Sequence, residues 1–239
     1  MSELYLARLF LNPRSRAVQH DLANCHALHQ RVMSGFPDGE ATGDARERFG
    51  VLYRVDGGGR SGRIVLLVQA RIEPDWARLP AGYLAAVGGD PANPEVKPIG
   101  GIYERIREGT ELAFRLRANP TKRDAVSGKR VELAREEQQV GWLERKGADG
   151  GFVIPAVTVR PSGQEGPVVR VGPAEGGGKQ VGWRRQGDEA SSRLTFGAVV
   201  FEGVLRVTDA DRLRAALATG IGSGKAYGFG LLSVAPVRG

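Results

Sequence analysis

The sequence predicts an α+β protein of two halves, each with the order strand, helix, strand, strand, helix, strand. The 239 residues allow one large domain or two small ones, short alternating apolar runs indicate strands, and apolar residues three and four apart indicate helices. Hydrophobic residues are 41% and charged residues 26% of the chain, as in folded globular proteins, although it contains 35 glycines and 13 prolines. No apolar stretch approaches the roughly 20 residues of a membrane-spanning helix, so we expect no membrane association.

The first half is predicted to span residues 1–118. Residues 4–11 are rich in leucine and aromatic side chains and end at Asn12-Pro13, which indicates a strand followed by a turn. Asn24 is a good N-cap for a helix over residues 24–36, and the turn DGGGRSG separates two strands over residues 49–55 and 63–71. Asp75 would cap a short helix to residue 84, and residues 88–101 would form a loop. Residues 111–118 alternate apolar and basic side chains, as expected of the last strand.

The second half is predicted to span residues 119–239 and to repeat this order. Strands are expected over residues 129–133, 151–159, 193–207 and 228–235, with a glycine-rich insertion after the second of them, up to residue 178. Helices are expected over residues 135–146 and 209–217, the latter opened by Asp209 and Asp211. Two such halves are typical of two tandem ferredoxin-like domains, each an antiparallel sheet backed by two helices, here with a C-terminal glycine-rich loop.

Basic residues are in excess and are unevenly distributed. Lysine and arginine number 34 against 27 acidic residues, a net charge of +7, which favours a polyanionic partner. One basic group lies between residues 115 and 130, with Asp124 as its only acid, and a second lies in a hairpin-like stretch near Trp183. The groups are Arg115, Arg117, Lys122, Arg123, Lys129 and Arg130, and then Arg184, Arg185 and Arg193. This local excess predicts a binding surface.

One cysteine and three histidines limit the chemistry available to the chain. Cys25 alone excludes an intramolecular disulfide and a zinc site with two or more cysteines. His20 stands apart, whereas His26 and His29 are three residues apart in the predicted helix and share one of its faces. Near neutral pH a histidine accepts and donates protons, and RNA phosphodiester transfer needs such a group at each end of the displacement. From the residues alone, two other interpretations of His26 and His29 stay open: an ordinary pair of exposed helix histidines and a less favoured His-x-x-His metal site. We expect neither a metal nor a cofactor.

The stretch TGIGSGKAYGFGLL, residues 219–232, contains five glycines around Lys225. Glycines let a backbone approach phosphates closely, so Gly222 and Gly224, with the charge of Lys225, are candidate phosphate contacts. The stretch is not a Walker A loop because Ala226 follows the lysine, and it is not a dinucleotide fingerprint because it follows a helix and leads into a strand. A helix C-cap with a flexible turn is the ordinary alternative, and it accounts for one or two of the glycines.

Several segments resemble the CasE endoribonucleases, which process CRISPR RNA precursors in type I-E systems and remain in the Cascade complex. The segments are LYLARLFLNPRSR, DLANCHALHQ, LAFRLRANPTKR followed by GKRV, WLERK, VVFEGVLRV and GIGSGKAYGFGLLSVAP. They extend from one end of the chain to the other, and ordered blocks are far more specific than a glycine spacing. The resemblance implies tandem ferredoxin-like domains with a C-terminal glycine-rich loop, in agreement with the two halves above.

The resemblance implies that His29 is the active-site histidine, acting as general acid or base without metal while a 2'-hydroxyl attacks the neighbouring phosphate. The products would be a 2',3'-cyclic phosphate and a 5'-hydroxyl. Members often carry a tyrosine where this chain has His26, so His26 either replaces it as proton acceptor or orients the substrate. The family's basic hairpin enters the groove of the repeat stem, and Arg184 and Arg185 lie in the corresponding stretch. Arg185 would also stabilise charge in the transition state.

Residues and resemblance together predict a metal-independent endoribonuclease that binds a CRISPR repeat stem-loop, cleaves at its 3' base and keeps the product. The expected partners are the CRISPR RNA repeat hairpin and other Cascade subunits. The alternatives are a non-catalytic RNA-binding subunit of the same ribonucleoprotein and an unrelated basic ferredoxin-like protein that binds RNA in general. The N-terminus has no basic segment ahead of its apolar run, so we expect no secretory signal and a cytoplasmic location.

Overall fold

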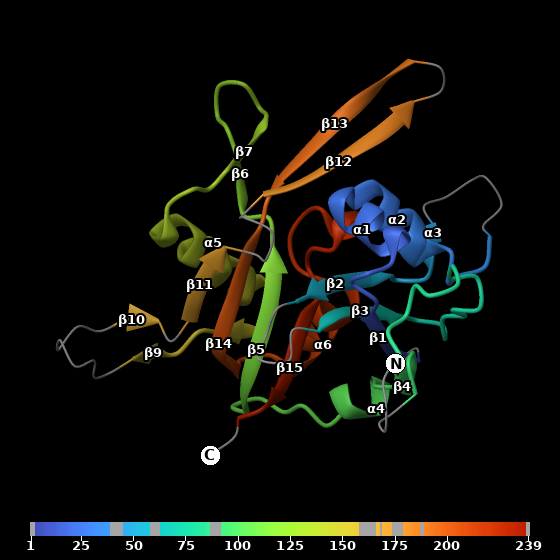
Figure 1. The fold of residues 1–239 in the computed structure, drawn as a ribbon. Helices are drawn as coiled ribbons and strands as arrows, with labels where there is room; N and C mark the ends of the chain where they lie inside the picture. The colour runs from blue at the N-terminus through green and yellow to red at the C-terminus, as the bar shows by residue number, and fades with distance from the viewer. Residues whose placement is uncertain are drawn as a thin grey trace.

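The computed structural model describes residues 3–38, 45–57, 63–86, 92–157, 166–167, 169–173, 179–186 and 189–237. Figure 1 shows two antiparallel sheets, one from each half of the chain, and a long hairpin of strands β12 and β13 that extends away from both. Among the described residues, no helix is both long enough and apolar enough to span a membrane.

The N-terminal sheet has the strand order β2-β3-β1-β4, with every neighbouring pair antiparallel. Its strands are β1 (Tyr5–Leu11), β2 (Leu52–Asp56), β3 (Ile64–Ala70) and β4 (Glu95–Pro98). The helices of this half are α1 (Arg16–Ala23), α2 (Cys25–Met33), α3 (Ala45–Arg48) and α4 (Gly100–Tyr103). Val18 of α1 and Leu28 of α2 are buried in one core with Leu9, Tyr53 and Leu66 of the strands, so the two longer helices cover one face of the sheet.

The predicted strands at 4–11, 49–55 and 63–71 and the helix at 24–36 are confirmed, with small differences at their ends. The predicted helix at 75–84 is wrong, since this segment consists of turns and irregular backbone and ends in an isolated bridge between Leu84 and Leu11. Pro80 lacks the amide donor that a helix interior needs, Gly82 has a φ of 71°, and Asp75 caps only the Ala77 amide. The loop expected at 88–101 is also wrong in part, because it contains β4, which pairs with β1 at the sheet edge.

The C-terminal sheet has the order β11-β14-β5-β15, again antiparallel, and β8 (Phe152–Val153) pairs with the end of β14. Its strands are β5 (Glu111–Ala118), β11 (Val169–Pro173), β14 (Val199–Val207) and β15 (Leu232–Pro236), and its helices are α5 (Glu136–Asp149) and α6 (Ala210–Thr219). In chain order these elements run β5, α5, β11, β14, α6, β15, which is the ferredoxin-like order. The N-terminal sheet has the matching strand order, so two tandem ferredoxin-like units are confirmed, although the described residues between β3 and β4 contain turns and no helix.

Hairpins interrupt the second unit. Those that the described residues form are β6 (Thr121–Arg123) with β7 (Arg130–Glu132), β9 (Ala156–Val157) with β10 (Gly166–Pro167), and β12 (Lys179–Gln186) with β13 (Glu189–Gly197). Residues 129–133 therefore contribute to a hairpin and not to the main sheet, and the predicted strand at 151–159 corresponds to β8 and β9 in its described part, residues 151–157. The second strand of the sheet is β11, inside the expected glycine-rich insertion. Residues 193–207 divide into β13 and β14, which pair in different sheets.

The strand at residues 111–118 exists, but its assignment to the first half is wrong. It is β5, and it pairs with β14 on one side and β15 on the other, in the C-terminal sheet. We propose that the units divide between β4 and β5 instead of at residue 118, since that division leaves each sheet whole.

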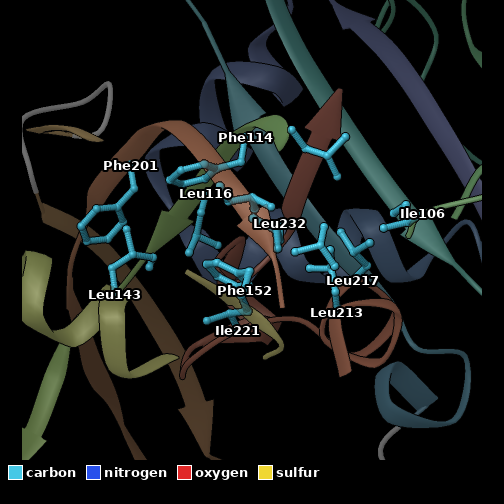
Figure 2. Close-up of a cluster of buried hydrophobic side chains, with 14 of the residues drawn as sticks. Ile106, Phe114, Leu116, Leu143, Phe152, Phe201, Leu213, Leu217, Ile221 and Leu232 are labelled. Atoms are coloured by element: carbon cyan, nitrogen blue, oxygen red, sulfur yellow. The ribbon is translucent and has the colours of Figure 1, made fainter. Parts of the chain in front are cut away.

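The C-terminal core lies between the second sheet and its two helices (Figure 2). Phe114 of β5 and Phe201 of β14 are buried with Leu143 of α5 and Leu217 of α6. Trp142 stacks on Phe201, with ring centroids 6.0 Å apart and an interplanar angle of 17°. Burial of large aromatic and aliphatic side chains is the main stabilising contribution in this unit.

Buried polar side chains connect the two units. Arg54 of β2 is 2% exposed and donates hydrogen bonds to the carbonyl oxygens of Arg115, at 3.2 Å, and Leu231, at 3.1 Å, both in the C-terminal half. Gln69 of β3 donates to the carbonyl oxygen of Leu217 near the end of α6, at 2.7 Å. Separating the units would leave these buried groups without partners, which is costly, so the junction is a fixed part of the fold.

Candidate active site

Helix α2 positions the paired histidines. Asn24 precedes the helix in extended backbone, with a φ of −133°, and its side-chain oxygen accepts a hydrogen bond from the His26 amide at 3.1 Å. His26 and His29 are both half-buried, and their ring centroids lie 6.4 Å apart at an interplanar angle of 32°. The structure therefore brings this pair together, whereas His20 is exposed on α1.

The glycine-rich loop between α6 and β15 brings a tyrosine to the histidines. The loop contains one turn of 3₁₀ helix, η1 (Lys225–Tyr227). The Tyr227 ring meets His29 edge-on, with centroids 6.0 Å apart, and lies 5.0 Å from the ring of Phe196 in β13. A phenol group both donates and accepts hydrogen bonds, so Tyr227 is a third polar group at this site. Tyr227 is absent from the site predicted by sequence, where its only signal is an aromatic residue among glycines.

Two strands hold this loop, one from each unit. Tyr53 of β2 donates its hydroxyl to the Ala226 carbonyl oxygen at 2.9 Å, and Arg117 of β5 donates to the Gly228 carbonyl oxygen at 3.3 Å. The Arg117 guanidinium also lies over the Phe229 ring, 4.7 Å from its centroid. Burial raises the pKa of the Tyr53 hydroxyl well above its usual range, so this hydroxyl stays protonated and donates.

Close packing explains two glycines that were candidate phosphate contacts. A Cβ atom on Gly222 would lie 2.9 Å from the Trp142 ring, and one on Gly224 would lie 2.9 Å from the Phe229 ring. Both residues have positive φ angles, 81° and 78°, which favour glycine. The loop thus needs glycine at these positions for its own conformation, and contact of Gly222 and Gly224 with RNA stays a prediction.

The β12–β13 hairpin is attached to the beginning of α2. Gly182 of β12 lies so close to this helix that a Cβ atom there would overlap the Cys25 Sγ atom and lie 3.1 Å from the Asn24 side-chain oxygen. The same oxygen accepts a hydrogen bond from the Trp183 amide at 3.1 Å. Asn24 therefore caps the histidine helix and holds the hairpin with one atom. Burial raises the pKa of the Cys25 thiol to about 11, which keeps it neutral in this contact.

The basic residues of the hairpin lie close to this point of attachment. Trp183 is 49% exposed, and the guanidinium of Arg193 lies 5.9 Å from its ring centroid. The backbone of Arg184 and Arg185 belongs to β12, but their side chains lie outside the described part of the structure. The predicted roles of Arg184, Arg185 and Arg193 in binding RNA stay predictions.

The two arginines of β5 have structural partners. Arg115 pairs with Asp56 of the first unit, at 3.3 Å, and with Glu202 of β14, at 2.7 Å. Arg117 is 8% exposed, and burial lowers its pKa from the usual value, although a guanidinium stays protonated. We therefore replace the prediction that Arg117 contacts RNA with the proposal that it supports the loop, because a buried guanidinium does not reach a phosphate.

The remaining predicted RNA-binding residues lie on a second surface. Lys122, Arg123 and Arg130 of the β6–β7 hairpin line a cleft of about 720 Å³ together with Lys225 of η1. Lys129 is exposed in the same hairpin, outside the lining of the cleft. Apart from Lys129 and the two arginines of β5, the structure thus divides the predicted basic residues between the β12–β13 hairpin and this cleft.

The fold and the site define a tandem ferredoxin-like protein whose paired histidines lie beside a glycine-rich loop and whose basic surfaces are of the kind that bind nucleic acid. The chain belongs to the CRISPR associated protein family, whose sequence model matches residues 4–236.

Two relatives and one solved structure illustrate this membership. The chain is 40% identical over 233 residues to the CRISPR-associated endoribonuclease Cse3 of Thermus thermophilus, covering 98% of this chain and 100% of the relative. It is 31% identical over 146 residues to the CRISPR system Cascade subunit CasE of Escherichia coli K12, covering 56% and 62% of the two chains. The solved structure of Thermus thermophilus Cse3 bound to an RNA that represents a pre-cleavage complex matches with a TM-score of 0.73 and 36% identity, covering 98% of this chain and 100% of that one.

Proposed function

We propose that this chain is an endoribonuclease that binds the stem-loop of a CRISPR repeat and cleaves the precursor RNA at the 3' base of the stem. The observation that carries the proposal is the pair His26 and His29, held beside Tyr227 in a chain that is 40% identical to an endoribonuclease over nearly its whole length. The relative's complex with RNA supports RNA as the substrate.

The proposed chemistry is metal-independent transfer of a phosphodiester. One group removes the proton from the 2'-hydroxyl as its oxygen attacks the adjacent phosphorus, and a second donates a proton to the leaving 5'-oxygen. The P–O5' bond breaks, leaving a 2',3'-cyclic phosphate and a 5'-hydroxyl. His29 takes one of these roles. His26, with its ring centroid 6.4 Å away, takes the other or orients the substrate, and the assignment of acid and base stays open.

The β12–β13 hairpin is the proposed contact with the repeat stem. Side chains from this hairpin, Arg184 and Arg193 among them, would bind the groove and its phosphates, and Arg185 would stabilise charge on the phosphorane-like transition state. Attachment of Gly182 and Trp183 to α2 supports this division of roles, because it fixes the stem-binding element relative to the histidines. The product would remain bound for assembly with other Cascade subunits, in the cytoplasm.

The test is cleavage of the cognate repeat hairpin in EDTA by the wild-type chain, His29→Ala and His26→Ala, with the 3' ends of the products identified. His20→Ala is the matched control, since His20 is an exposed histidine outside the site. We expect wild type and His20→Ala to form the cyclic phosphate. We expect His29→Ala to lose cleavage with nearly unchanged hairpin affinity. The cleavage rate of His26→Ala then shows how much His26 contributes compared with His29.

Two results would contradict this proposal. Equal activity of His29→Ala and wild type removes His29 from the mechanism. Tight hairpin binding without cleavage by the wild type supports the other function, a non-catalytic RNA-binding subunit of the same ribonucleoprotein.

A further inference from the structure

The β12–β13 hairpin, the histidine helix α2 and the glycine-rich loop contact one another in pairs around His29. Gly182 of β12 packs against the beginning of α2. Phe196 of β13 and Tyr227 of η1 have ring centroids 5.0 Å apart, and those of Tyr227 and His29 lie 6.0 Å apart. Figure 1 shows the loop, in red, beside α2 and below the hairpin. The contacts thus form a closed set, and Tyr227 takes part in two of the three.

The register of the hairpin places Phe196 on the face that meets α2. In an antiparallel pair, directly opposite residues share a face, and so do alternate residues along one strand. Phe196 is opposite Gln180, which is two residues before Gly182 in β12. The Phe196 ring also packs against the buried Phe229, with centroids 5.7 Å apart. The contact of Phe196 with the loop is therefore on the inner side of the hairpin and is supported by a buried ring.

The backbone that carries Tyr227 is held on both sides. The preceding residue, Ala226, accepts a hydrogen bond from the Tyr53 hydroxyl through its carbonyl oxygen, at 2.9 Å. The following residue, Gly228, accepts one from Arg117 in the same way, at 3.3 Å. Both donor side chains are buried. The ring of Tyr227 is thus presented to the histidine from a fixed turn.

The orientation of the His29 imidazole depends on more than its helix. The helix fixes the Cα and Cβ atoms, whereas the χ2 torsion of a histidine has broad energy minima. Proton transfer requires a ring nitrogen that is aligned with the substrate oxygen and within hydrogen-bond distance of it. The rings of His26 and Tyr227 adjoin that of His29, at interplanar angles of 32° and 63°. The edge-on contact with Tyr227 is a favoured aromatic geometry, so it stabilises one orientation of the imidazole.

We propose that Tyr227 is a positioning residue of the nuclease and that its ring, supported by Phe196, fixes the orientation of the His29 imidazole. The proposal rests on the proposed function, in that His29 transfers a proton. The role belongs to the ring, through which both contacts are made. Because Phe196 belongs to the hairpin proposed to bind the repeat stem, the same contacts connect the stem-binding element to the His29 ring.

The first measurement is the NMR spectrum of the imidazole C–H groups in the chain without RNA. The chain has three histidines, so the signals are few, and His29→Ala identifies those of His29. Tyr227→Leu should shift the His29 signals, because it removes the ring current of a neighbouring aromatic ring, and Tyr227→Phe should keep them close to wild type. Phe196→Leu, the second variant, should shift them by less. Tyr5→Leu, at a partly exposed tyrosine of β1, is the matched control and should leave them unchanged.

The second measurement is single-turnover cleavage of the cognate repeat hairpin. Affinity is measured separately, with an RNA whose 2'-deoxynucleotide at the cleavage site removes the attacking hydroxyl. From the usual strength of an aromatic contact we expect Tyr227→Leu to cleave about three- to tenfold more slowly, with less than about twofold change in affinity. Tyr227→Phe, the conservative variant, should restore the rate, and Tyr5→Leu should cleave like wild type.

Three results would overturn the proposal. Unchanged His29 signals in Tyr227→Leu would show that the tyrosine ring does not set the surroundings of the imidazole. Failure of Tyr227→Phe to restore the rate would assign the role to the hydroxyl, and loss of RNA affinity in Tyr227→Leu would make Tyr227 an RNA contact. If the wild type cleaves nothing while the His29 signals respond to Tyr227→Leu, the nuclease proposal fails and the ring contact stands.

Discussion

Gly182 lies where strand β12 crosses the beginning of helix α2, and replacing it with alanine tests whether this contact sets the geometry of the site. An added Cβ atom would overlap the Cys25 Sγ atom, lie 3.1 Å from the Asn24 side-chain oxygen and lie 3.2 Å from the His26 amide nitrogen. Since Cys25 is fully buried and its side chain is short, the sulfur has little room to move away.

The expected cost of Gly182→Ala follows from this overlap. Overpacking of a well-packed site by one methyl group typically costs about 1–3 kcal/mol, and for a chain of this length 2 kcal/mol corresponds to a Tm lower by roughly 4–8 °C. If the hairpin instead moves away from α2, stability is kept and the stem-binding strand shifts relative to His29, so that the single-turnover cleavage rate falls.

Thermal unfolding and single-turnover cleavage of the repeat hairpin together measure both outcomes. Gly101→Ala is the control, because a Cβ atom there has nothing within 4 Å, so this substitution should lower neither the Tm nor the cleavage rate. Cys25→Ala removes the sulfur and should partly rescue Gly182→Ala, with a coupling of about 0.5–3 kcal/mol. A Gly182→Ala chain with wild-type Tm and wild-type cleavage would refute the reasoning, and absence of rescue by Cys25→Ala would show that the sulfur is not the obstacle.

Two further predictions concern the buried groups around the loop and the helix. Tyr53→Phe leaves the Ala226 carbonyl oxygen without its 2.9 Å hydrogen bond and should cost about 1–3 kcal/mol in urea unfolding; a change below the error of the measurement would contradict this role. The Cys25 pKa rises from 9.0 to about 11 on folding, so the folded state favours the neutral thiol. The resulting contribution to the free energy of unfolding is complete below pH 9 and is lost as the pH rises through 11. The stability difference between wild type and Cys25→Ala should therefore narrow between pH 9 and pH 11, and a constant difference would contradict the prediction.

Local signals were sufficient for the helix that carries the histidines. Asn24 has the residue type that caps helices, and its side chain makes the expected bond to the His26 amide. The spacing of His26 and His29 places them on one helix face in any α-helix, so their proximity follows without tertiary information. Runs of apolar residues similarly predicted the first three strands, because each is bounded by a turn.

Pairing between distant segments could not be predicted in the same way. The alternation of residues 111–118 predicts a strand, but its partners are residues 199–206 and 232–236, and nothing in its own pattern selects them over the first sheet. Strand β11 is not predicted, because it lies in a glycine-rich stretch with a weak strand signal. It becomes a strand by pairing with β14, which is distant in the sequence. Tyr227 was missed for the same reason, since its contact with His29 depends on how a loop of the second unit folds onto the first.

The position of Tyr227 relative to His29 also depends on hydrogen bonds that other residues make to the glycine-rich loop. His29 belongs to the first unit and Tyr227 to the second, and the loop between α6 and β15 is held by Tyr53 from the first unit and Arg117 from the second. Substitution that removes either hydrogen bond is expected to shift the loop, and Tyr227 with it. A loss of cleavage in such a variant therefore does not identify a catalytic residue. The pH dependence of the rate separates the cases, since removal of a proton-transfer group changes its shape, whereas displacement of the loop lowers the rate at every pH.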